Sequence, residues 1–485
     1  MAIDKVRFTI YNISDLVNDK KLSYKSNKMQ KNEQSKASLV RNYILNNLEN
    51  GTFASGYRLP GVKRIASELG VSHAVVQNVI DTLSTEGIIY TVPRGGSYVQ
   101  NKWRKRVLHT NITTFEIDRP WVTELQKLLN TYIPEMRLTE QFEESTFEIQ
   151  TTTTVQARHD EYMDLSSLFD ECFPDKRDFD LTPFKSFYFD DKLAGLPIMF
   201  SPRVMFFNPQ ILKEGGCAMP KKGWTWSDFI KIIKQLRRTV APERIMSLAN
   251  EPHYWMNLVA RNGGGLINYQ LPDPVVIDSE QTIRGLEMFR ELERLVNVVE
   301  EPGTTSFFVK KDVAFCIGGR ECVPRFNSNN WFEWHAVPLP EIPGGIDTSM
   351  QVTDLLCIRK NCTDMNTARE IIKLFMSERF QNILGELKYG IPIRKSAAVK
   401  SLDLSDTRDV MFLEESAKVM REYNLNSPLL FNMVKQGISM CLISDIDIRP
   451  MIKDLASSLR TYLEISNNTW SKKYIQQNLE VTNVF

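Results

Sequence analysis

The feature that most constrains this 485-residue chain is a three-residue turn, Gly70-Val71-Ser72, between two short amphipathic segments. Residues 62–69 before the turn carry apolar side chains on one helical face, and residues 73–86 after it repeat apolar side chains at helical spacing. Glycine suits the left-handed residue that ends a helix, and serine suits the N-cap of the next helix. Two helices therefore meet at a tight turn, with one side of the second helix buried and the other side free.

The segments on either side complete a small domain. Residues 38–48 have a third amphipathic helical pattern, which Asn50-Gly51 ends. After Gly87, residues 88–99 have the pattern of a β-hairpin with Arg94-Gly95-Gly96 at its tip. Three helices followed by a hairpin predict a winged helix-turn-helix, which is a fold of DNA-binding proteins. A packing module of three helices, without contact to DNA, is the alternative.

The charge distribution favours the DNA-binding interpretation. The whole chain has a formal net charge of only +1, but the residues up to Arg106 contain 17 Lys and Arg against 8 Asp and Glu. The rest of the chain contains 43 basic and 51 acidic residues. A basic N-terminal part on a mildly acidic body is expected when only one end of a protein meets a polyanion.

The second helix of the pair is expected to lie in the major groove with its N-terminal polar residues at the base edges. Basic side chains around it would hold phosphates, and the glycine-rich hairpin tip would let the backbone approach DNA closely. The residues expected to contact DNA are Arg41, Arg58, Lys63, Arg64, Ser72, His73, Gln77, Arg94 and Gly96.

The sequence of residues 36–99 resembles the winged-helix domain of GntR-type transcription regulators. The resemblance is carried by "LPGVKRIASELGVSHAVVQNVIDTLSTEGIIY" followed by "GGSYV", because helix, turn, recognition helix and wing occur in the family's order. It implies DNA contacts at Lys63, Ser72, His73, Gln77 and Gly96. The chain has Gly61, Lys63, His73 and Val75 where the family favours Ser, Arg, Arg and Thr. Loss of a bidentate arginine weakens the direct readout of guanine, whereas the predicted fold is unchanged.

Beyond residue 107, predicted strands alternate with predicted helices, which indicates an α/β body with largely parallel sheets. Strands are expected at 107–118, 136–145, 147–155 and 197–208, and helices at 119–133, 225–236 and 282–296. The seven cysteines form no C-x-x-C pair, and the five histidines are scattered. This pattern predicts free thiols and no metal site. The phrases of the body that are quoted below supply no catalytic lysine setting, so we also expect no cofactor and no catalytic function.

The body resembles extracellular solute-binding proteins that deliver sugars to ABC transporters, the maltodextrin-binding class with a type II periplasmic-binding-protein fold. Six short phrases carry the resemblance in the family's order: Gly195-Leu196-Pro197, Phe206-Phe207-Asn208, Pro220 to Trp226, Gly263-Gly264-Gly265, Ala336 to Pro340 and Gly390-Ile391-Pro392. It implies two α/β lobes joined by crossing strands and closing over a ligand. The expected domains are thus a flexible basic extension at 1–35, the winged helix-turn-helix at 36–100, a basic linker at 101–106 and the two-lobed body at 107–485.

A sugar site needs aromatic faces for the rings and polar side chains for the hydroxyl groups. By position in the family, the resemblance implies ligand contacts after the first strand, after the phrase Leu196-Pro197-Ile198, on the aromatic helix, and in the later turn and the strand that follows it. The candidate ligand-binding residues are Asp118, Arg119, Ser201, Arg203, Glu251, His253, Trp255, Gly319, Arg320, Trp331 and Trp334. Each of these tryptophans is equally compatible with a place in the core.

Together these patterns predict a transcription regulator whose body senses a carbohydrate or a related polar solute. We expect a homodimer, because one DNA-reading module buries too little surface to be specific alone. The N-terminus has no apolar segment of a secretory signal and no run approaches the roughly 20 apolar residues of a membrane span, so we expect a cytoplasmic protein. The alternatives are a ligand-blind DNA-binding protein with a degenerate sensor, or an enzyme body fused to a DNA reader.

Overall fold

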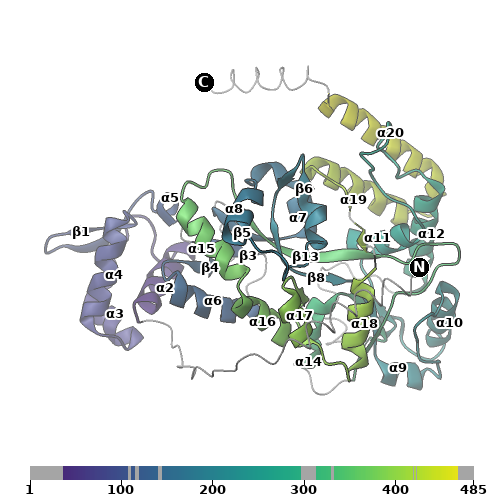
Figure 1. Cartoon of the computed structure of the whole chain (residues 1–485), viewed down its shortest axis with the longest axis horizontal. Coiled ribbons are helices and arrows are strands. Elements are labelled where there is room, and N and C mark those ends of the chain that lie inside the picture. Colours follow the sequence, from purple (N-terminus) through teal and green to yellow (C-terminus); the bar gives the residue numbers. More distant parts are fainter. Residues whose placement is uncertain are drawn as a thin grey trace.

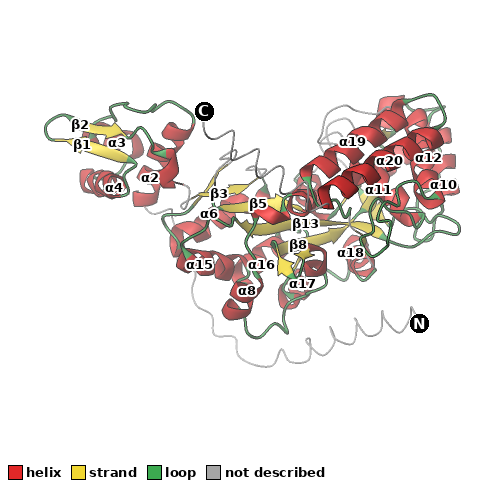
Figure 2. Ribbon diagram, turned by 90° about the horizontal axis from the view of Figure 1, so that it is seen from above, coloured by secondary structure: helices red, strands yellow, loops and turns green. Residues whose placement is uncertain are grey.

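A computed structural model describes residues 36–107, 111–114, 119–139, 145–296, 313–328, 333–418, 420–421 and 423–467 of the chain (Figure 1). The predicted basic extension at 1–35 lies outside these residues. A small helical unit with a hairpin forms one end of the molecule, and a larger α/β body forms the rest (Figure 2). Within the described part of the chain, no helix combines the length and the hydropathy needed to cross a bilayer.

The N-terminal unit has the predicted order of three helices and a hairpin. Its elements are α2 (Lys36–Glu49), α3 (Val62–Leu69), α4 (His73–Thr85), β1 (Ile89–Val92) and β2 (Gly96–Val99), followed by α5 (Arg104–Val107). The turn follows the predicted chemistry: Gly70 has a φ of 64°, in the left-handed region, and the Ser72 hydroxyl accepts a hydrogen bond from the Val75 amide at 3.4 Å. Local residue choice therefore fixes the angle between α3 and α4.

The core of this unit includes residues from the segment expected to be a linker. Val40, Ile44, Val76 and Leu83 from α2 and α4 are completely or almost completely buried in it. Trp103 is 4% exposed and belongs to the same cluster. Trp103, from the predicted linker, therefore packs as part of the DNA-reading unit.

The first lobe of the body is built on a seven-stranded mixed sheet with the order β14-β8-β13-β5-β3-β4, with β15 (Met420–Arg421) beside β13. Apolar side chains from both faces of this sheet and from the surrounding helices form its core. The elements are β3 (Asn111–Thr114), α6 (Pro120–Tyr132), β4 (Arg137–Thr139), β5 (Phe147–Thr151), α7 (Thr152–Ala157), η2 (His159–Glu161), α8 (Ser166–Cys172), η3 (Pro183–Phe187), β6 (Tyr188–Phe189), β7 (Lys192–Leu193), β8 (Leu196–Pro202), β13 (Ser349–Ile358), α15 (Met365–Phe375), α16 (Glu378–Glu386), β14 (Ile391–Pro392) and α17 (Lys395–Ser401).

The second lobe is built on a four-stranded sheet with the order β10-β11-β9-β12. Its main core lies between this sheet and the helices α10, α11, α12, α19 and α20. The elements are β9 (Val204–Phe207), α9 (Pro209–Glu214), α10 (Trp226–Leu236), η4 (Pro242–Arg244), β10 (Met246–Ser247), α11 (Pro252–Arg261), α12 (Glu280–Leu295), β11 (Phe315–Gly318), η5 (Arg320–Cys322), α14 (Val323–Asn327), β12 (His335–Val337), α18 (Thr407–Ser416), α19 (Pro428–Ile443) and α20 (Ile448–Asn467).

The chain crosses between the lobes at two adjacent points. Strand β8 of the first lobe ends at Pro202 and β9 of the second lobe begins at Val204, so Arg203 is the crossing residue. The return crossing leads into β13 at Ser349, whose hydroxyl accepts a hydrogen bond from the Arg203 amide at 2.7 Å and donates to the Arg203 carbonyl oxygen at 3.2 Å. The two crossing segments are thus tied to each other.

Two predictions about the body are wrong. The sheets are mixed, because β13 runs antiparallel to both β5 and β8, and β9 runs antiparallel to both β11 and β12. The strand expected at 147–155 ends at Thr151, and residues 152–157 form a helix. Long crossing strands return through the sheet from the other lobe, and sequence alternation alone does not reveal their direction.

Helix α2 also packs against the first lobe through a polar cluster around Arg137 on β4. The Arg137 guanidinium pairs with Glu49, donates to the Asn46 side-chain oxygen at 2.6 Å and donates to the Asn111 side-chain oxygen at 3.1 Å. Asn111 in turn donates to Glu49 at 3.1 Å. We call these four residues the junction. It joins a helix of the DNA-reading unit directly to two strands of the sensor body.

Candidate functional sites: a DNA-reading surface and an interlobe cleft

The free face of α4 presents the polar residues that the sequence placed at the base edges. His73 and Gln77 are exposed, and Ser72 is exposed at the N-cap. The Gln77 amide donates to Asp81 at 2.8 Å, one turn further along the same face. A side chain held by one exposed hydrogen bond of this kind can exchange that partner for a base edge at small cost.

Four basic residues surround this face. Arg58, Lys63, Arg64 and Arg94 are all exposed. Arg94 lies at the tip of the β1–β2 hairpin with a φ of 57°. Gly96 follows it with a φ of 103°, and a Cβ there would meet the Arg58 guanidinium at 3.0 Å, so this position needs glycine. The hairpin tip and its two arginines thus form a compact cationic projection beside α4.

Arg41 lies elsewhere. Its guanidinium makes two hydrogen bonds to the Glu86 carboxylate, at 2.9 and 2.8 Å, and its side chain is only 8% exposed. This bidentate pair ties α2 to the end of α4. The geometry gives Arg41 a place inside the unit rather than on the surface that the other basic residues share.

Comparison with protein families confirms the interpretation of this unit. Residues 36–99 match the family described as bacterial regulatory proteins, gntR family. This part of the chain is a GntR-type DNA-binding domain. A comparison of the whole chain with curated proteins finds no match.

Behind the GntR-type domain, a polar cleft of about 280 Å³ lies between the two lobes of the body. Four of the sequence-predicted ligand residues meet there: Arg119 from the start of α6, Arg203 at the crossing, and Glu251 and His253 at the start of α11. The cleft is completed by Thr151, Thr152, Thr153, Pro252, Glu321, Gln351, Val352, Thr353, Asp354, Tyr423 and Phe431.

Most of the charges in the cleft are paired. Arg119 donates to Asp354 at 3.2 Å, and the Tyr389 hydroxyl donates to the same carboxylate at 2.7 Å. Glu251 pairs with Lys435 at 2.9 Å. Burial lowers the pKa of His253 well below its usual range, and the positive charge of Arg203 adds to this effect. The imidazole is therefore neutral at pH 7 and can both donate and accept a hydrogen bond.

Arg203 and Glu321 are the exceptions. Neither has an ion pair with a described residue, and the Arg203 Nε and the Glu321 Oε2 are both buried without a hydrogen-bond partner among the described residues. A buried donor without a partner costs about 1–3 kcal/mol. A ligand oxygen in the cleft would remove that cost. Arg203 is also the crossing residue, so a ligand held by it would act where the lobes join.

Three further predicted residues form a network behind the cleft. Ser201 accepts a hydrogen bond from the Arg320 amide at 2.8 Å. The Arg320 guanidinium, whose side chain is 1% exposed, donates to the Gly390 carbonyl oxygen at 2.6 Å and to Asp409 at 2.9 Å. The amide of Gly319, which precedes Arg320, donates a hydrogen bond to the Glu321 carboxylate at 3.2 Å. These residues hold the lobes together near the crossing, and Arg320 has its charge satisfied internally.

The predicted aromatic platforms do not line the cleft. Trp255 is 1% exposed in the main core of the second lobe. Trp334 is 5% exposed in a smaller cluster, edge-on to Phe206, with the Arg408 guanidinium 4.3 Å from its ring centre. Asp118 and Trp331 lie outside the described residues.

Sequence reasoning missed the threonines and β13 residues of the cleft. Thr151, Thr152 and Thr153 stand where β5 ends and α7 begins, and Gln351 to Asp354 belong to a strand two hundred residues later. The run of four threonines directly after an apolar strand is the one signal that indicates a cluster of hydroxyl groups at a strand end. No local sequence signal indicates that β13 lies beside these threonines.

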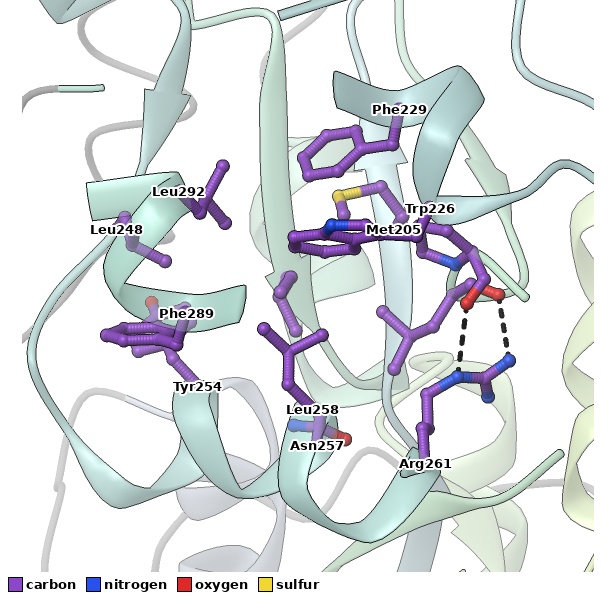
Figure 3. Close-up of a pocket in the computed structure, with 13 residues that line it drawn as sticks. Met205, Trp226, Phe229, Leu248, Tyr254, Asn257, Leu258, Arg261, Phe289 and Leu292 are labelled. Atoms are coloured by element: carbon purple, nitrogen blue, oxygen red, sulfur yellow. Dashed lines mark hydrogen bonds between the residues drawn. The ribbon is translucent and has the colours of Figure 1, made fainter. Parts of the chain in front are cut away.

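A second cavity, inside the second lobe, is apolar and has a volume of about 20 Å³ (Figure 3). Met205, Trp226 and Phe229 form one side, and Arg261 at its edge donates to the Pro340 and Leu339 carbonyl oxygens, each at 3.2 Å. A space of this size holds about one water molecule. It is therefore a packing defect and not a ligand site. Among the described residues, no cluster of His, Cys, Asp or Glu could hold a metal ion.

Comparison with solved structures confirms the fold predicted for the body. The ABC substrate-binding protein Lmo0181 from Listeria monocytogenes, in complex with cycloalternan, matches with a TM-score of 0.63 at 15% identity, over 73% of this chain and 99% of that protein. UgpB from Mycobacterium tuberculosis, in complex with glycerophosphocholine, matches with a TM-score of 0.62 at 13% identity, over 73% and 98%. Maltose-bound MalE3 from T. maritima matches with a TM-score of 0.60 at 14% identity, over 73% and 99%. The chain thus combines a GntR-type domain with a solute-binding-protein fold.

Proposed function

We propose that this protein is a transcription regulator in which a polar solute, of the carbohydrate type, binds in the interlobe cleft and changes the affinity of the GntR-type domain for its operator. It acts in the cytoplasm, where its DNA is, and binds a palindromic operator as a homodimer. The observation that carries the proposal is the fusion of a DNA-reading domain with a two-lobed body. At the crossing between the lobes, the cleft of this body contains an arginine, Arg203, that has no ion pair with any described residue.

The composition of the cleft supports a neutral ligand rich in hydroxyl groups. Four threonine hydroxyls, the neutral His253 and the Gln351 amide offer both donors and acceptors. The carboxylates of Glu251, Glu321 and Asp354 stand against the charges of Arg119, Arg203 and the neighbouring Lys435, so the cleft has no strong excess of either sign. Phe431 on α19 provides an apolar surface for a sugar ring.

The junction provides the route by which the cleft acts on DNA binding. Cleft residues on β5 and β13 belong to the same sheet as β3 and β4, which carry Asn111 and Arg137. A rotation of this sheet relative to the second lobe therefore moves Asn111 and Arg137, the two residues to which α2 is bound. Because α2 forms the core of the GntR-type domain with α4, we propose that lobe closure reorients the reading helix.

The test is a thermal-shift screen of the full-length chain against neutral mono- and oligosaccharides, repeated on Arg203→Met and on the control Arg237→Met. Arg237 is an exposed arginine at the end of α10, away from the cleft. A ligand that stabilises the wild type and the control, but binds at least tenfold more weakly to Arg203→Met, supports the assignment. If no solute stabilises the wild type, the protein is a ligand-blind DNA-binding protein and the sensing part of the proposal is wrong.

DNA binding is tested separately with a random 30-base-pair duplex. Lys63→Ala and Arg94→Ala should each weaken binding and lower the slope of log K against log salt by about 0.9, the value for one phosphate contact. Arg41→Ala should leave that slope unchanged, because its guanidinium is paired with Glu86 inside the unit. Equal slopes for all variants and the wild type would contradict the assigned phosphate contacts.

A further inference from the structure

Two charged side chains of the interlobe cleft have no partner of opposite charge. Arg203 lies at the crossing and Glu321 lies on η5 of the second lobe, and neither forms an ion pair with a described residue. The other charged residues that line the cleft each have an ion-pair partner. The described residues of the cleft therefore leave one positive and one negative charge for a bound molecule.

The Glu321 carboxylate is held through one of its two oxygens. Its Oε1 accepts hydrogen bonds from the Gly319 amide at 3.2 Å and from the Cys322 thiol at 3.8 Å, whereas its Oε2 is buried without a partner among the described residues. The Ser201 hydroxyl lies nearby, but it donates its hydrogen to the Pro202 carbonyl oxygen at 2.8 Å. A Cβ at position 319 would overlap the carboxylate, so glycine is needed there. Oε2 thus requires a donor from a molecule in the cleft.

Arg203 is fixed at its backbone and unpaired at its side chain. Its amide and its carbonyl oxygen both bond to the Ser349 hydroxyl, at 2.7 and 3.2 Å, while its Nε is buried without an acceptor among the described residues. Burial raises the pKa of the Cys316 thiol to about 12, and the charges of Arg203 and Glu321 act on this same thiol in opposite directions. The guanidinium and the carboxylate therefore lie at the same end of the cleft, where one small molecule reaches both.

A solute that enters this end of the cleft displaces water from both atoms and must replace both hydrogen bonds. It needs an acceptor for the Arg203 Nε and a donor for the Glu321 Oε2. A hydroxyl group can fill either role, but it leaves each charge without an opposite charge in a partly buried site. A carboxylate at Arg203 and an ammonium at Glu321 supply the hydrogen bonds and the opposite charges together, and charge-assisted hydrogen bonds are the stronger kind.

The remainder of the cleft indicates what joins these two groups. Thr151, Thr152 and Thr153 line it from the first lobe, where β5 ends and α7 begins. Their hydroxyl groups suit a ligand that carries hydroxyl groups of its own. The ligand that satisfies the whole cleft is therefore a polyhydroxylated molecule with one ammonium and one carboxylate, and its net charge is zero.

We propose that the effector is an amino sugar acid whose ammonium group binds Glu321 and whose carboxylate binds Arg203. This inference rests on the proposed function and names the chemical class of its effector. It also adds Glu321 to the residues that select the effector. Because Glu321 belongs to the second lobe and the three threonines belong to the first, such a solute contacts both lobes at once and favours the state in which they are close.

The test adds four matched pyranoses to the screen of the proposed function. Glucosaminuronic acid has both the ammonium and the carboxylate, glucosamine has only the ammonium, glucuronic acid has only the carboxylate, and glucose has neither. Isothermal titration calorimetry of the full-length chain at pH 7 measures each Kd. We expect glucosaminuronic acid to bind at least about tenfold more tightly than each of the other three.

The outcomes separate this inference from the proposed function. If a neutral sugar of the screen binds but glucosaminuronic acid does not bind more tightly than each of its three analogues, only this inference is wrong. If neither the four pyranoses nor any other solute of the screen binds to the wild type, the sensing part of the proposed function fails with it.

Two variants assign each charge to its residue. Glu321→Gln keeps the size of the side chain and an acceptor for the Gly319 amide, and it should weaken binding of the two amine-bearing sugars at least about tenfold while glucuronic acid stays within about threefold. Arg203→Met should instead weaken binding of the two carboxylate-bearing sugars and spare glucosamine. The controls Glu243→Gln, exposed on η4, and Arg237→Met should bind all four sugars as the wild type does.

The thermal unfolding midpoint shows whether each variant is folded. An equal loss of affinity for all four sugars in folded Glu321→Gln would mean that this residue shapes the cleft without binding an ammonium group, and the inference would be overturned.

Discussion

Removal of either partner of the Arg137–Glu49 pair should have unequal costs, because the two side chains are buried to different extents. The Arg137 side chain is 3% exposed and that of Glu49 is 20% exposed. Burial lowers the pKa of Arg137, and the charge of Glu49 opposes this effect. Glu49→Ala therefore leaves a buried cation with only the Asn46 and Asn111 amides as partners, and we expect a loss of about 3 kcal/mol of unfolding free energy.

Arg137→Met removes the buried charge and leaves a carboxylate that already reaches solvent. We expect a smaller loss, about 1–2 kcal/mol, from the two amides that lose their donor. The double variant should be destabilised by at least ~1.5 kcal/mol less than the sum of the single variants, which is the coupling energy of a partly buried charge pair. Urea unfolding of the three variants measures these quantities.

The same variants test the route from the cleft to DNA. In Arg137→Met/Glu49→Ala, effector binding and binding to random duplex should stay within about twofold of the wild type, but the change in DNA affinity caused by the effector should disappear. Additive single-variant costs, within about 0.5 kcal/mol, would refute the energetic reasoning. An unchanged effector response in a folded double variant would refute the role of the junction.

Two other predictions concern stability. Burial raises the pKa of Glu293 to about 7. The contribution of this carboxyl group to stability therefore falls as pH rises from about 4.5 and is fully lost above 7. Because the side chain is partly exposed to solvent, Glu293→Gln should raise the unfolding free energy at pH 8 by about 1–2 kcal/mol and have little effect at pH 4.5. A Cβ on Gly285 of α12 would lie 2.6 Å from the Val259 Cα of α11, whereas one on Gly437 would meet only the flexible end of Leu455. Gly285→Ala should therefore cost about 1–3 kcal/mol in thermal unfolding and Gly437→Ala clearly less, and the opposite order would contradict the close packing of α11 on α12.

The parts of the fold that local chemistry determines could be predicted from the sequence. Gly70 and Ser72 act through their own backbone and side chain, so the turn between α3 and α4 follows from residue type alone. The helix expected at 225–236 begins at Trp226, because Thr225 is its N-cap and forms a capping box with Asp228. Local signals therefore identify helix ends to within one or two residues.

The cleft was predicted only in part, because its residues come together through long-range pairing. Arg119, Arg203, Glu251 and His253 follow element ends that the sequence marks, and these are the predicted residues that reach the cleft. Trp255 lies two residues after His253, yet helical geometry turns it into the core. An aromatic residue on an amphipathic helix has the same pattern whether it packs inside or stacks on a ligand, so periodicity cannot separate the two cases.

The double use of α2 has a consequence for the evolution of such regulators. Helix α2 contributes to the core of the DNA-reading domain, and it also binds Asn111 and Arg137 of the sensor body through its polar side chains. A different solute-binding body with the equivalents of Asn111 and Arg137 could replace this one. It would then control DNA binding in response to whichever solute its own cleft binds. Recombination between regulators and transport proteins would then need to preserve a few polar side chains, not a matched linker. New effector specificities would be acquired by exchange of whole bodies.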